Sequence, residues 1–305
     1  MKGTMRKKIV VTGSNGQLGS ELRAIDRAGR YRDGYEFVFT DVAELDITDA
    51  VAVQAFVGHE RPQWIVNAAA YTAVDRAESD AERAELLNAT AVRNLVSAAE
   101  AVGAGFVQVS TDYVFDGLRP ADEHALTEEE PTGPQSVYGR TKLAGEAAAL
   151  AYDRSFVVRT AWLYSTYGNN FVKTMLRLGA ERPELGVVAD QWGTPTYARD
   201  LAAAIMEMVA FADEHPDAAG FGLYHYTNGG RTNWCEFARE IMRLGGRNCA
   251  VRAITTAEYP AAAARPAWSV LSTERIRATF GVLVPDWRES LAECVRSLNS
   301  AEPEA

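Results

Sequence analysis

Residues 8–19 read KIVVTGSNGQLG, a short apolar run followed by glycines at positions 13, 16 and 19. The run predicts a buried strand, and the residues after the second glycine predict the start of a helix. Glycines at such a turn let the backbone bend tightly and approach a pyrophosphate, and the first N–H groups of the helix attract anions. An ordinary strand-to-helix turn also contains glycines. Because the motif joins the first strand to the first helix, however, we predict that Gly13, Gly16 and Gly19 bind a dinucleotide.

Beyond this turn, the first half of the chain alternates between two patterns. Short apolar runs typical of buried strands alternate with longer segments that place apolar residues on one helical face. The predicted strands span 8–12, 36–40, 64–67, 106–110 and 156–159, and the predicted helices span 17–28, 50–57, 84–102 and 137–151. This alternation predicts an α/β fold with a doubly wound parallel sheet of the Rossmann type.

The pattern loosens after about residue 160, where Gly, Pro and Asn become frequent. Helices are expected at 170–179, 198–212 and 232–244, a strand at 223–227, and a frayed polar tail at 300–305. We therefore expect an NAD(P)-binding domain over 1–163. A smaller α/β region, mainly substrate-binding, is expected over 164–305, with some segments around 190–213 returning to the first sheet.

The composition excludes several functional classes. The net charge is −10, whereas proteins that bind nucleic acid are usually basic. No apolar run approaches the roughly 18 residues of a membrane helix, and the run after the basic start is too short for a secretory signal. The three cysteines lie far apart, as in a reducing compartment, and the histidines lack metal-ligand spacing. These features predict a cytoplasmic protein without nucleic-acid or membrane partners.

Asp41 closes the second predicted strand. A carboxylate at this position accepts hydrogen bonds from the adenosine ribose of NAD and repels the 2′-phosphate of NADP. However, Lys7, Arg23, Arg27 or Arg30 could lie close enough to offset that repulsion. The sequence therefore predicts NADPH or NADH as the cofactor without deciding between them.

Tyr138 and Lys142, in the segment YGRTK, share one face of the predicted helix 137–151. A tyrosine has a pKa near 10, and a nearby ammonium group lowers it, so that the phenol can protonate a carbonyl oxygen as hydride reaches the carbon. Such a pair alone also fits a surface helix. Yet Ser110 and Thr111 end a predicted strand, at the edge where ligands of open α/β sheets bind. Together these features predict a ketone reductase.

Eight segments resemble a known family. They are VTGSNGQLGSEL (11–22), VNAAAYTAVDRAESD (66–80), LNATAV (87–92), VSTDYVFDG (109–117), VYGRTKLAGE (137–146), VVRTAWLY (157–164), NNFVKTMLRL (169–178) and DQWGTPTY (190–197). The chain resembles the extended short-chain dehydrogenases and, within them, the dTDP-4-dehydrorhamnose reductases. The resemblance covers about 5–200 and continues more thinly through WCEFA (234–238), an Arg-Pro pair (265–266) and VPDW (284–287).

The resemblance implies a role for each of several residues. Tyr138 would donate the proton, Lys142 would position the cofactor and tune Tyr138, and Thr111 would polarise the substrate. The cofactor would contact Gly13, Gly16, Gln17, Leu18, Gly19, Asp41, Asp46, Ile47, Ala70, Tyr71, Thr72, Val109, Tyr138 and Lys142. The substrate would contact Thr111, Asp112, Trp162, Asn169, Asn170 and Arg265. For Trp162, whose ring suits the apolar face of a sugar, plain core packing is the alternative.

Two details of the resemblance bear on the ligands. Some members of the family hold Mg²⁺ at a dimer contact through a glutamate of the first helix, where this chain has Glu21. Its other ligands are not obvious in the sequence, so no metal site is predicted. Members also often carry a polar residue where this chain has Ala267 and Trp268, so the substrate pocket is expected to differ in detail there.

The resemblance implies reduction of the C4 ketone of dTDP-4-dehydro-6-deoxy-L-mannose to dTDP-L-rhamnose with NADPH or NADH, by a monomer or homodimer, whereas the residues alone indicate only a ketone reductase with a nucleotide cofactor. One alternative is another nucleotide-sugar reductase or an epimerase of the same superfamily. A 4,6-dehydratase would need a glutamate after Asp112, where the chain has Tyr113. A non-catalytic NADP-binding regulatory subunit is the other alternative, although such proteins often lose the Tyr or Lys that are present here.

Overall fold

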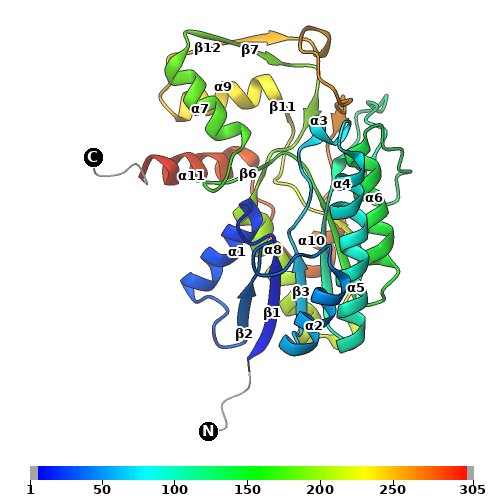
Figure 1. Cartoon of the computed structure of the whole chain (residues 1–305). Coiled ribbons are helices and arrows are strands. Elements are labelled where there is room, and N and C mark those ends of the chain that lie inside the picture. Colours follow the sequence, from blue (N-terminus) through cyan, green and yellow to red (C-terminus); the bar gives the residue numbers. More distant parts are fainter. Residues whose placement is uncertain (1–5, 301–305) are drawn as a thin grey trace.

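The computed structural model describes residues 6–300, which are built around one sheet of six parallel strands (Figure 1). The strands, in spatial order, are β2 (Tyr35–Phe39), β1 (Lys7–Thr12), β3 (Trp64–Asn67), β4 (Gly105–Thr111), β5 (Ser155–Thr160) and β10 (Gly222–His225). The chain runs from β1 to β2 on one side and resumes at β3 on the other. Ligands of such sheets bind beyond the C-terminal strand ends at this reversal.

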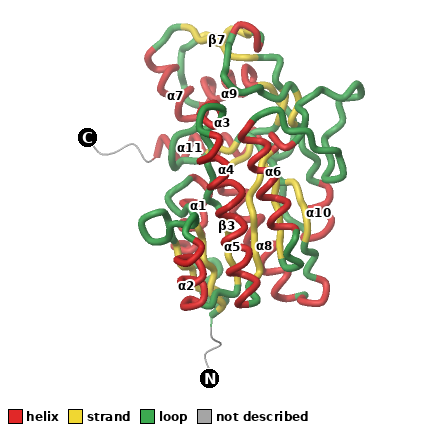
Figure 2. Tube along the Cα trace, turned by 45° about the vertical axis from the view of Figure 1, so that its right-hand side comes forward, coloured by secondary structure: helices red, strands yellow, loops and turns green. Residues whose placement is uncertain are grey.

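Helices cover both faces of the sheet, so the predicted doubly wound α/β fold is confirmed. One face carries α1 (Gln17–Ala28), α8 (Ala198–Glu214) and α10 (Glu274–Phe280), and the other carries α2 (Ala50–Glu60), α5 (Ala91–Val102) and α6 (Val137–Leu150). Figure 2 shows α5 and α6 side by side along the sheet. Successive strand residues serve the two layers, because Ile9 and Val11 pack in the core with α8, and Val10 packs in the core with α5.

The helix predicted at 84–102 is present, but it contains a π-helical turn that periodicity did not predict. The structure has α3 (Val74–Ala77), α4 (Ala81–Glu85) and a π-helical turn (Leu86–Thr90) before α5. Within that turn, Asn88 donates to the Tyr71 carbonyl and the Thr141 hydroxyl and accepts from the Tyr71 amide. These bonds tie the turn to two neighbouring segments. Side-chain bonds of this kind cannot be read from helical periodicity, and π turns of this kind often mark functional sites.

A smaller layer lies beyond the C-terminal ends of the large sheet (Figure 1). Its helices are α7 (Phe171–Glu181), α9 (Trp234–Leu244) and α11 (Trp287–Ser300). Its short strands form three sets: β7 (Glu184–Val188) with β12 (Ala250–Ile254), β6 (Leu163–Tyr164) with β9 (Thr196–Tyr197), and β8 (Trp192–Gly193) with β11 (Thr232–Asn233) and β13 (Trp268–Ser269). The helices share an apolar core that includes Met175, Ile241 and Leu291.

The second half of the chain contributes to both layers. α8 packs against α1, and β10 extends the large sheet beside β5. The helix predicted at 232–244 begins two residues late, because residues 232–233 form β11 and the Asn233 side chain caps α9 by accepting from the Glu236 amide at 2.9 Å. α10, α11 and most short strands were not predicted. Apart from Ser300, the predicted tail lies outside the described residues.

None of the helices within residues 6–300 is long and apolar enough to cross a membrane.

Candidate active site

The glycine turn after β1 has almost no room for side chains. Gly13 has φ 65°, and a Cβ there would come within 2.7 Å of the Ala69 backbone. A Cβ on Gly19 would lie 2.4 Å from the Cα of Ser14. Gly16 precedes α1, and no side chain of residues 6–300 caps that helix end. The backbone is therefore open to a pyrophosphate, and the first N–H groups of α1 are available to an anion.

Asp41 lies at the end of the cavity next to this turn. Its carboxylate accepts from the amide of Asn15 at 3.0 Å and from that of Val42 at 2.8 Å, so the group is fixed while it lines the cavity. A carboxylate fixed in this way suits a ribose diol.

The basic residues that could offset Asp41 are mostly engaged elsewhere. Lys7 pairs with Asp213 at 3.2 Å, and Arg30 pairs with Glu207 at 3.4 Å. Arg23 stays near the turn, where it donates to the Ser14 hydroxyl at 2.9 Å and its guanidinium lies 4.4 Å from the centre of the Phe39 ring. Arg23 is thus a cation close to the turn that could offset the repulsion of a 2′-phosphate by Asp41.

The predicted catalytic residues meet on one wall of the cavity. Ser136 begins α6 by accepting from the Gly139 amide at 3.0 Å, and this cap places Tyr138 and Lys142 in its first turns. Lys142 donates its Nζ to the carbonyl of Val109 at 2.6 Å. Thr111 ends β4 beside Tyr138, whose ring packs edge-on against Tyr113 with centroids 5.5 Å apart. β4 and α6 therefore hold this wall together.

Burial controls the protonation of the pair. It raises the pKa of Tyr138 to about 12, although a hydrogen bond from Thr111 acts in the opposite direction. Burial also lowers the pKa of Lys142 to about 8, against the attraction of Glu146. Removal from water is the largest influence on the phenol, and the role of Lys142 in tuning Tyr138 stays a prediction. A phenol with a raised pKa is fully protonated at neutral pH.

Asp112 is a buried carboxyl on the same wall. Burial raises its pKa to about 6, while a hydrogen bond from Thr111 acts to lower it. Thr111 donates to Oδ1 at 2.9 Å, and Oδ2 has no hydrogen-bond partner among the described residues. Because Asp112 lines the cavity, this unpaired buried oxygen can accept a hydrogen bond from a ligand.

A buried ion pair lies behind the wall. Arg159 on β5 binds the Glu146 carboxylate through Nε at 2.9 Å and Nη2 at 2.7 Å, and Ser110 donates to the same carboxylate at 2.5 Å. His225 on β10 faces Arg159 at 3.5 Å, and its pKa is lowered to about 3 by burial and by that cation. The pair therefore links α6 to three strands of the sheet.

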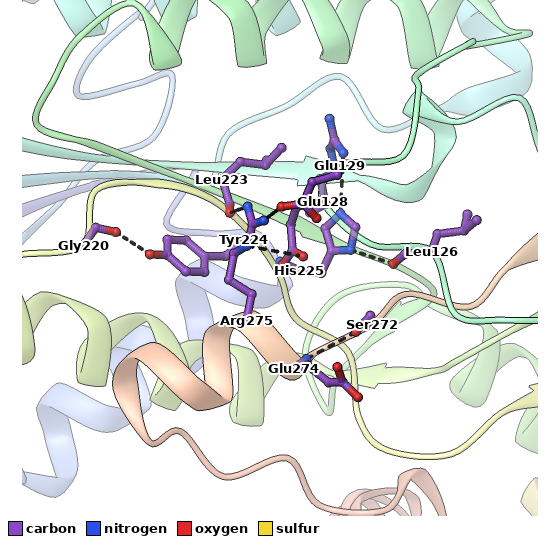
Figure 3. Close-up of polar contacts among 11 residues, drawn as sticks. Leu126, Glu128, Glu129, Gly220, Leu223, Tyr224, His225, Ser272, Glu274 and Arg275 are labelled. Carbon is purple, nitrogen blue, oxygen red and sulfur yellow. Dashed lines mark hydrogen bonds and ion pairs between the residues drawn. The ribbon is translucent and has the colours of Figure 1, made fainter.

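Figure 3 shows the outer end of this arrangement, at the edge strand β10. The Glu128 carboxylate accepts from the His225 amide at 2.9 Å, and Arg275 of α10 lies 3.7 Å from Glu128. The ring of His225 meets the carbonyl of Leu126 at 3.2 Å. The segment that carries Leu126 and Glu128 is thus fastened to the edge of the sheet.

The cavity has a volume of about 770 Å³, which is in the range of small-molecule sites. It runs from the glycine turn to the catalytic wall and gathers most of the predicted residues. Those that line it are Gly13, Gly16, Gln17, Leu18, Asp41, Asp46, Ile47, Ala70, Thr72, Val109, Thr111, Asp112, Tyr138, Lys142, Trp162 and Asn169.

Four predicted contact residues do not line the cavity. Gly19 packs against Ser14, and Tyr71 donates its hydroxyl to Asp80 at 3.0 Å. Asn170 caps α7 and donates to the Gln17 side chain at 3.1 Å, so it supports a lining residue from behind. Arg265 pairs with Asp75 at 2.5 Å and borders a separate cavity of about 30 Å³. We place these side chains behind or beside the cavity.

Several lining residues were missed. Arg83 of α4 brings a cation to the cavity, and Tyr113 lies between the large cavity and the small one that Arg265 borders. Val42 and Leu45 extend the wall next to Asp41. Tyr113 lies three residues beyond the predicted strand 106–110, so its place in the sequence could have indicated it. Nothing in the sequence around Arg83 marks it as different from a surface arginine.

Glu21, the residue weighed for a metal, is buried on the far side of the glycine turn. Ser165 donates to its carboxylate at 2.6 Å, and burial raises its pKa. Residues 6–300 contain no group of three His, Cys, Asp or Glu side chains arranged to hold a metal ion.

The sequence matches the family described as "RmlD substrate binding domain" over residues 6–300. A dTDP-4-dehydrorhamnose reductase of Burkholderia thailandensis is 42% identical, over 96% of this chain and 99% of the relative.

Solved structures of similar proteins match this chain over nearly its full length. A dTDP-4-dehydrorhamnose reductase of Clostridium acetobutylicum has a TM-score of 0.88 and 43% identity, over 96% of this chain and 99% of its own. One from Bacillus anthracis, in complex with NADP, has a TM-score of 0.87 and 40% identity, over 96% of this chain and 100% of its own.

Proposed function

The chain belongs to the RmlD substrate binding domain family, and on this basis we propose that it is an NADPH-dependent oxidoreductase of dTDP-rhamnose synthesis. The reaction is reduction of the C4 ketone of dTDP-4-dehydro-6-deoxy-L-mannose, and the product is dTDP-L-rhamnose. The observation that carries this proposal is the meeting of Tyr138, Lys142 and Thr111 on the wall of a cavity whose other end is the glycine turn.

The residues fit a nicotinamide dinucleotide. Gly13 and Gly16, with the N–H groups that open α1, would hold the pyrophosphate. A side chain at Gly13 would strike the backbone of Ala69, so the tight turn requires glycine there. Asp41 holds the adenosine ribose, and Lys142 the nicotinamide ribose. When bound, the reduced nicotinamide supplies hydride to the C4 carbon of the sugar.

The chain's own groups handle the proton and the developing charge. Tyr138, protonated at neutral pH because burial raises its pKa to about 12, donates its phenolic proton to the C4 oxygen. The Thr111 hydroxyl, which donates to Asp112 in this structure, would turn to donate its hydrogen bond to the same oxygen. Lys142 stabilises the phenolate left on Tyr138. A tyrosine that begins protonated favours the reductive direction.

The sugar and nucleotide have their own contacts. Asp112 accepts a hydrogen bond from a hydroxyl of the sugar through Oδ2, which has no hydrogen-bond partner in the described chain. Trp162 covers a face of the sugar ring. Asn169, which lines the cavity, would contact the nucleotide. Arg265, which pairs with Asp75, serves the nucleotide end from outside the large cavity.

The two parts of the chain divide the ligands between them. The cofactor domain spans 1–163 and the substrate region 164–305, and the packing of α8 on α1 supports a return of 190–213 to the first domain. The protein works in the cytoplasm as a monomer or homodimer on a nucleotide sugar. The net charge of −10 argues against a nucleic-acid partner.

The test is the loss of reduced-nicotinamide absorbance after dTDP-4-dehydro-6-deoxy-L-mannose is added, with NADPH and NADH measured separately. Tyr138→Phe keeps the ring and removes the proton donor, so turnover should fall by about 1,000-fold while NADPH binding is retained. A folded protein that binds NADPH but shows no sugar-dependent oxidation would contradict the reductase. Unchanged turnover in Tyr138→Phe would contradict the assigned role of Tyr138.

A further inference from the structure

Trp162 adopts a backbone conformation that bulky residues rarely take. Its φ is 49°, in the left-handed region that crowds the Cβ of every residue except glycine. The residue connects β5 to β6, and its carbonyl accepts from the Thr196 amide at 3.2 Å. A strained backbone persists only where the surroundings hold it, and such residues gather at functional sites. Because Trp162 lines the cavity, the groups that hold its ring matter.

Trp234 holds one face of that ring. The two indoles stack with centroids 3.6 Å apart and planes 11° apart. Trp234 is the first residue of α9, and the Asn233 cap fixes the start of that helix. Phe171 of α7 packs against Trp234 with centroids 4.7 Å apart. The smaller layer therefore supports a side chain that enters the cavity from the end of β5.

Gly193 leaves the space that the edge of the ring occupies. A Cβ at this position of β8 would lie 2.7 Å from Cε2 and 2.8 Å from Cζ2 of Trp162, and 2.7 Å from the hydroxyl of Ser269. Gly193 is buried, so a side chain there could not turn away into solvent. One face of the Trp162 indole is therefore covered by Trp234, and the residue still lines the cavity.

We propose that Trp234 and Gly193 are positioning residues that fix the indole of Trp162 as the platform for the sugar ring. They thereby set the affinity for the nucleotide sugar and leave cofactor binding unchanged. This inference rests on the proposed function, because it takes the ligand of Trp162 to be the sugar. A sugar ring presents a face of C–H groups, and stacking on it requires an aromatic plane of fixed orientation. A ring that is fixed beforehand loses less freedom when the ligand binds.

The experiment compares Trp234→Leu and Gly193→Ala with Trp287→Leu, a matched control. Trp287 is a fully buried indole of the same layer that packs against Phe237 at 5.7 Å between centroids. The measurements are KM and kcat for the ketosugar, calorimetric binding of dTDP-L-rhamnose and of NADPH, and the melting temperature. Far-ultraviolet circular dichroism gives a readout independent of activity, because two stacked indoles couple and produce a paired positive and negative band.

We expect KM and the dissociation constant of dTDP-L-rhamnose to rise about tenfold in Trp234→Leu and Gly193→Ala, with NADPH binding unchanged. Trp234→Phe should restore most of the affinity, and the paired band should vanish in Trp234→Leu but persist in Trp287→Leu. Unchanged sugar affinity in Gly193→Ala, or an equal loss in Trp287→Leu, would overturn the proposal. An inactive wild-type protein that binds dTDP-L-rhamnose through the stack would instead contradict the proposed reaction.

Discussion

The cofactor end and the sugar end of the cavity are built in different ways. At the cofactor end, the glycine turn follows one strand and opens one helix, within residues 13–19. At the sugar end, the indole of Trp162 depends on Trp234 and Gly193, which belong to α9 and β8. The turn is made of backbone and consecutive residues, whereas the support of Trp162 is made of residues that only tertiary folding brings together. A change in the first should affect cofactor binding, and a change in the second should affect the sugar.

The largest effect is expected when a single methyl group is added to the glycine turn. In Gly19→Ala the new Cβ would lie 2.4 Å from the Cα of Ser14, so α1 must move away from the strand end. We expect NADPH to bind roughly 100-fold more weakly, or about 2.8 kcal/mol. Titration calorimetry measures this loss.

The matched control is Gly58→Ala in α2, where a Cβ would meet nothing within 4 Å. This change should leave NADPH binding unchanged and raise stability by about 0.5–1 kcal/mol, as expected for Gly to Ala within a helix. If both variants bind NADPH like the wild type, the turn does not depend on close backbone packing.

The same contrast explains what could be predicted from the sequence. Gly13, Asp41, Tyr138 and Lys142 were predicted because strand, turn and helix patterns place them at the right strand ends, and the structure gathers them around one cavity. Arg83 could not be found, because nothing near it in sequence distinguishes it from a surface arginine.

The features that the sequence did not reveal have physical causes. The helix predicted at 84–102 contains a π turn, in which Asn88 bonds to Tyr71 and Thr141, two residues distant in sequence. Burial, which no local motif encodes, raises the pKa of Tyr138 to about 12. Long-range contacts and removal from water therefore account for most of what the sequence did not predict.

A second prediction concerns the catalytic wall, where Lys142 depends on the buried ion pair of Glu146 and Arg159. Burial lowers the pKa of Lys142 to about 8, and the Glu146 carboxylate raises it. Asp112 and Tyr138 line the same cavity as Lys142, and Arg159 binds Glu146 behind the wall. If Lys142 must carry its proton, activity should fall as pH rises through about 8. Glu146→Gln removes the raising influence, so the fall should move to lower pH.

The pH profile of kcat/KM measures this shift, and at pH 8 we expect about a tenfold loss that is recovered at lower pH. Glu128→Gln changes a carboxylate at the far end of the same arrangement, beside His225, and should not move the profile. Because Arg159 loses a buried partner in Glu146→Gln, the melting temperature of this variant should also fall. A profile that is lower in height but unshifted would mean that Glu146 acts only through folding.

A third prediction tests the choice of cofactor at the end of β2. Asp41→Asn keeps the size of the side chain and removes the charge that would repel a 2′-phosphate, while Arg23 remains near the turn. We expect the ratio of kcat/KM for NADPH to that for NADH to rise by about fivefold, because one charge at the edge of an open site is partly screened. The sugar KM should stay constant. A change in sugar KM without a change in this ratio would contradict the inference that the cofactor end and the sugar end act separately.

The smallest effect is expected where the cavity meets the surface. Asp75 holds Arg265 at 2.5 Å, and both groups are partly exposed, so the pair contributes at most about 1 kcal/mol. If Arg265 serves the nucleotide of the substrate, the diphosphate must compete with Asp75 for the guanidinium. Asp75→Asn should therefore lower the KM for the nucleotide sugar by about twofold, and Arg265→Gln should raise it. Both variants should bind NADPH like the wild type. Opposite shifts in the two variants place Arg265 at the sugar end of the contrast, whereas equal losses in both mean that the pair only fastens α3 to the segment that carries Arg265.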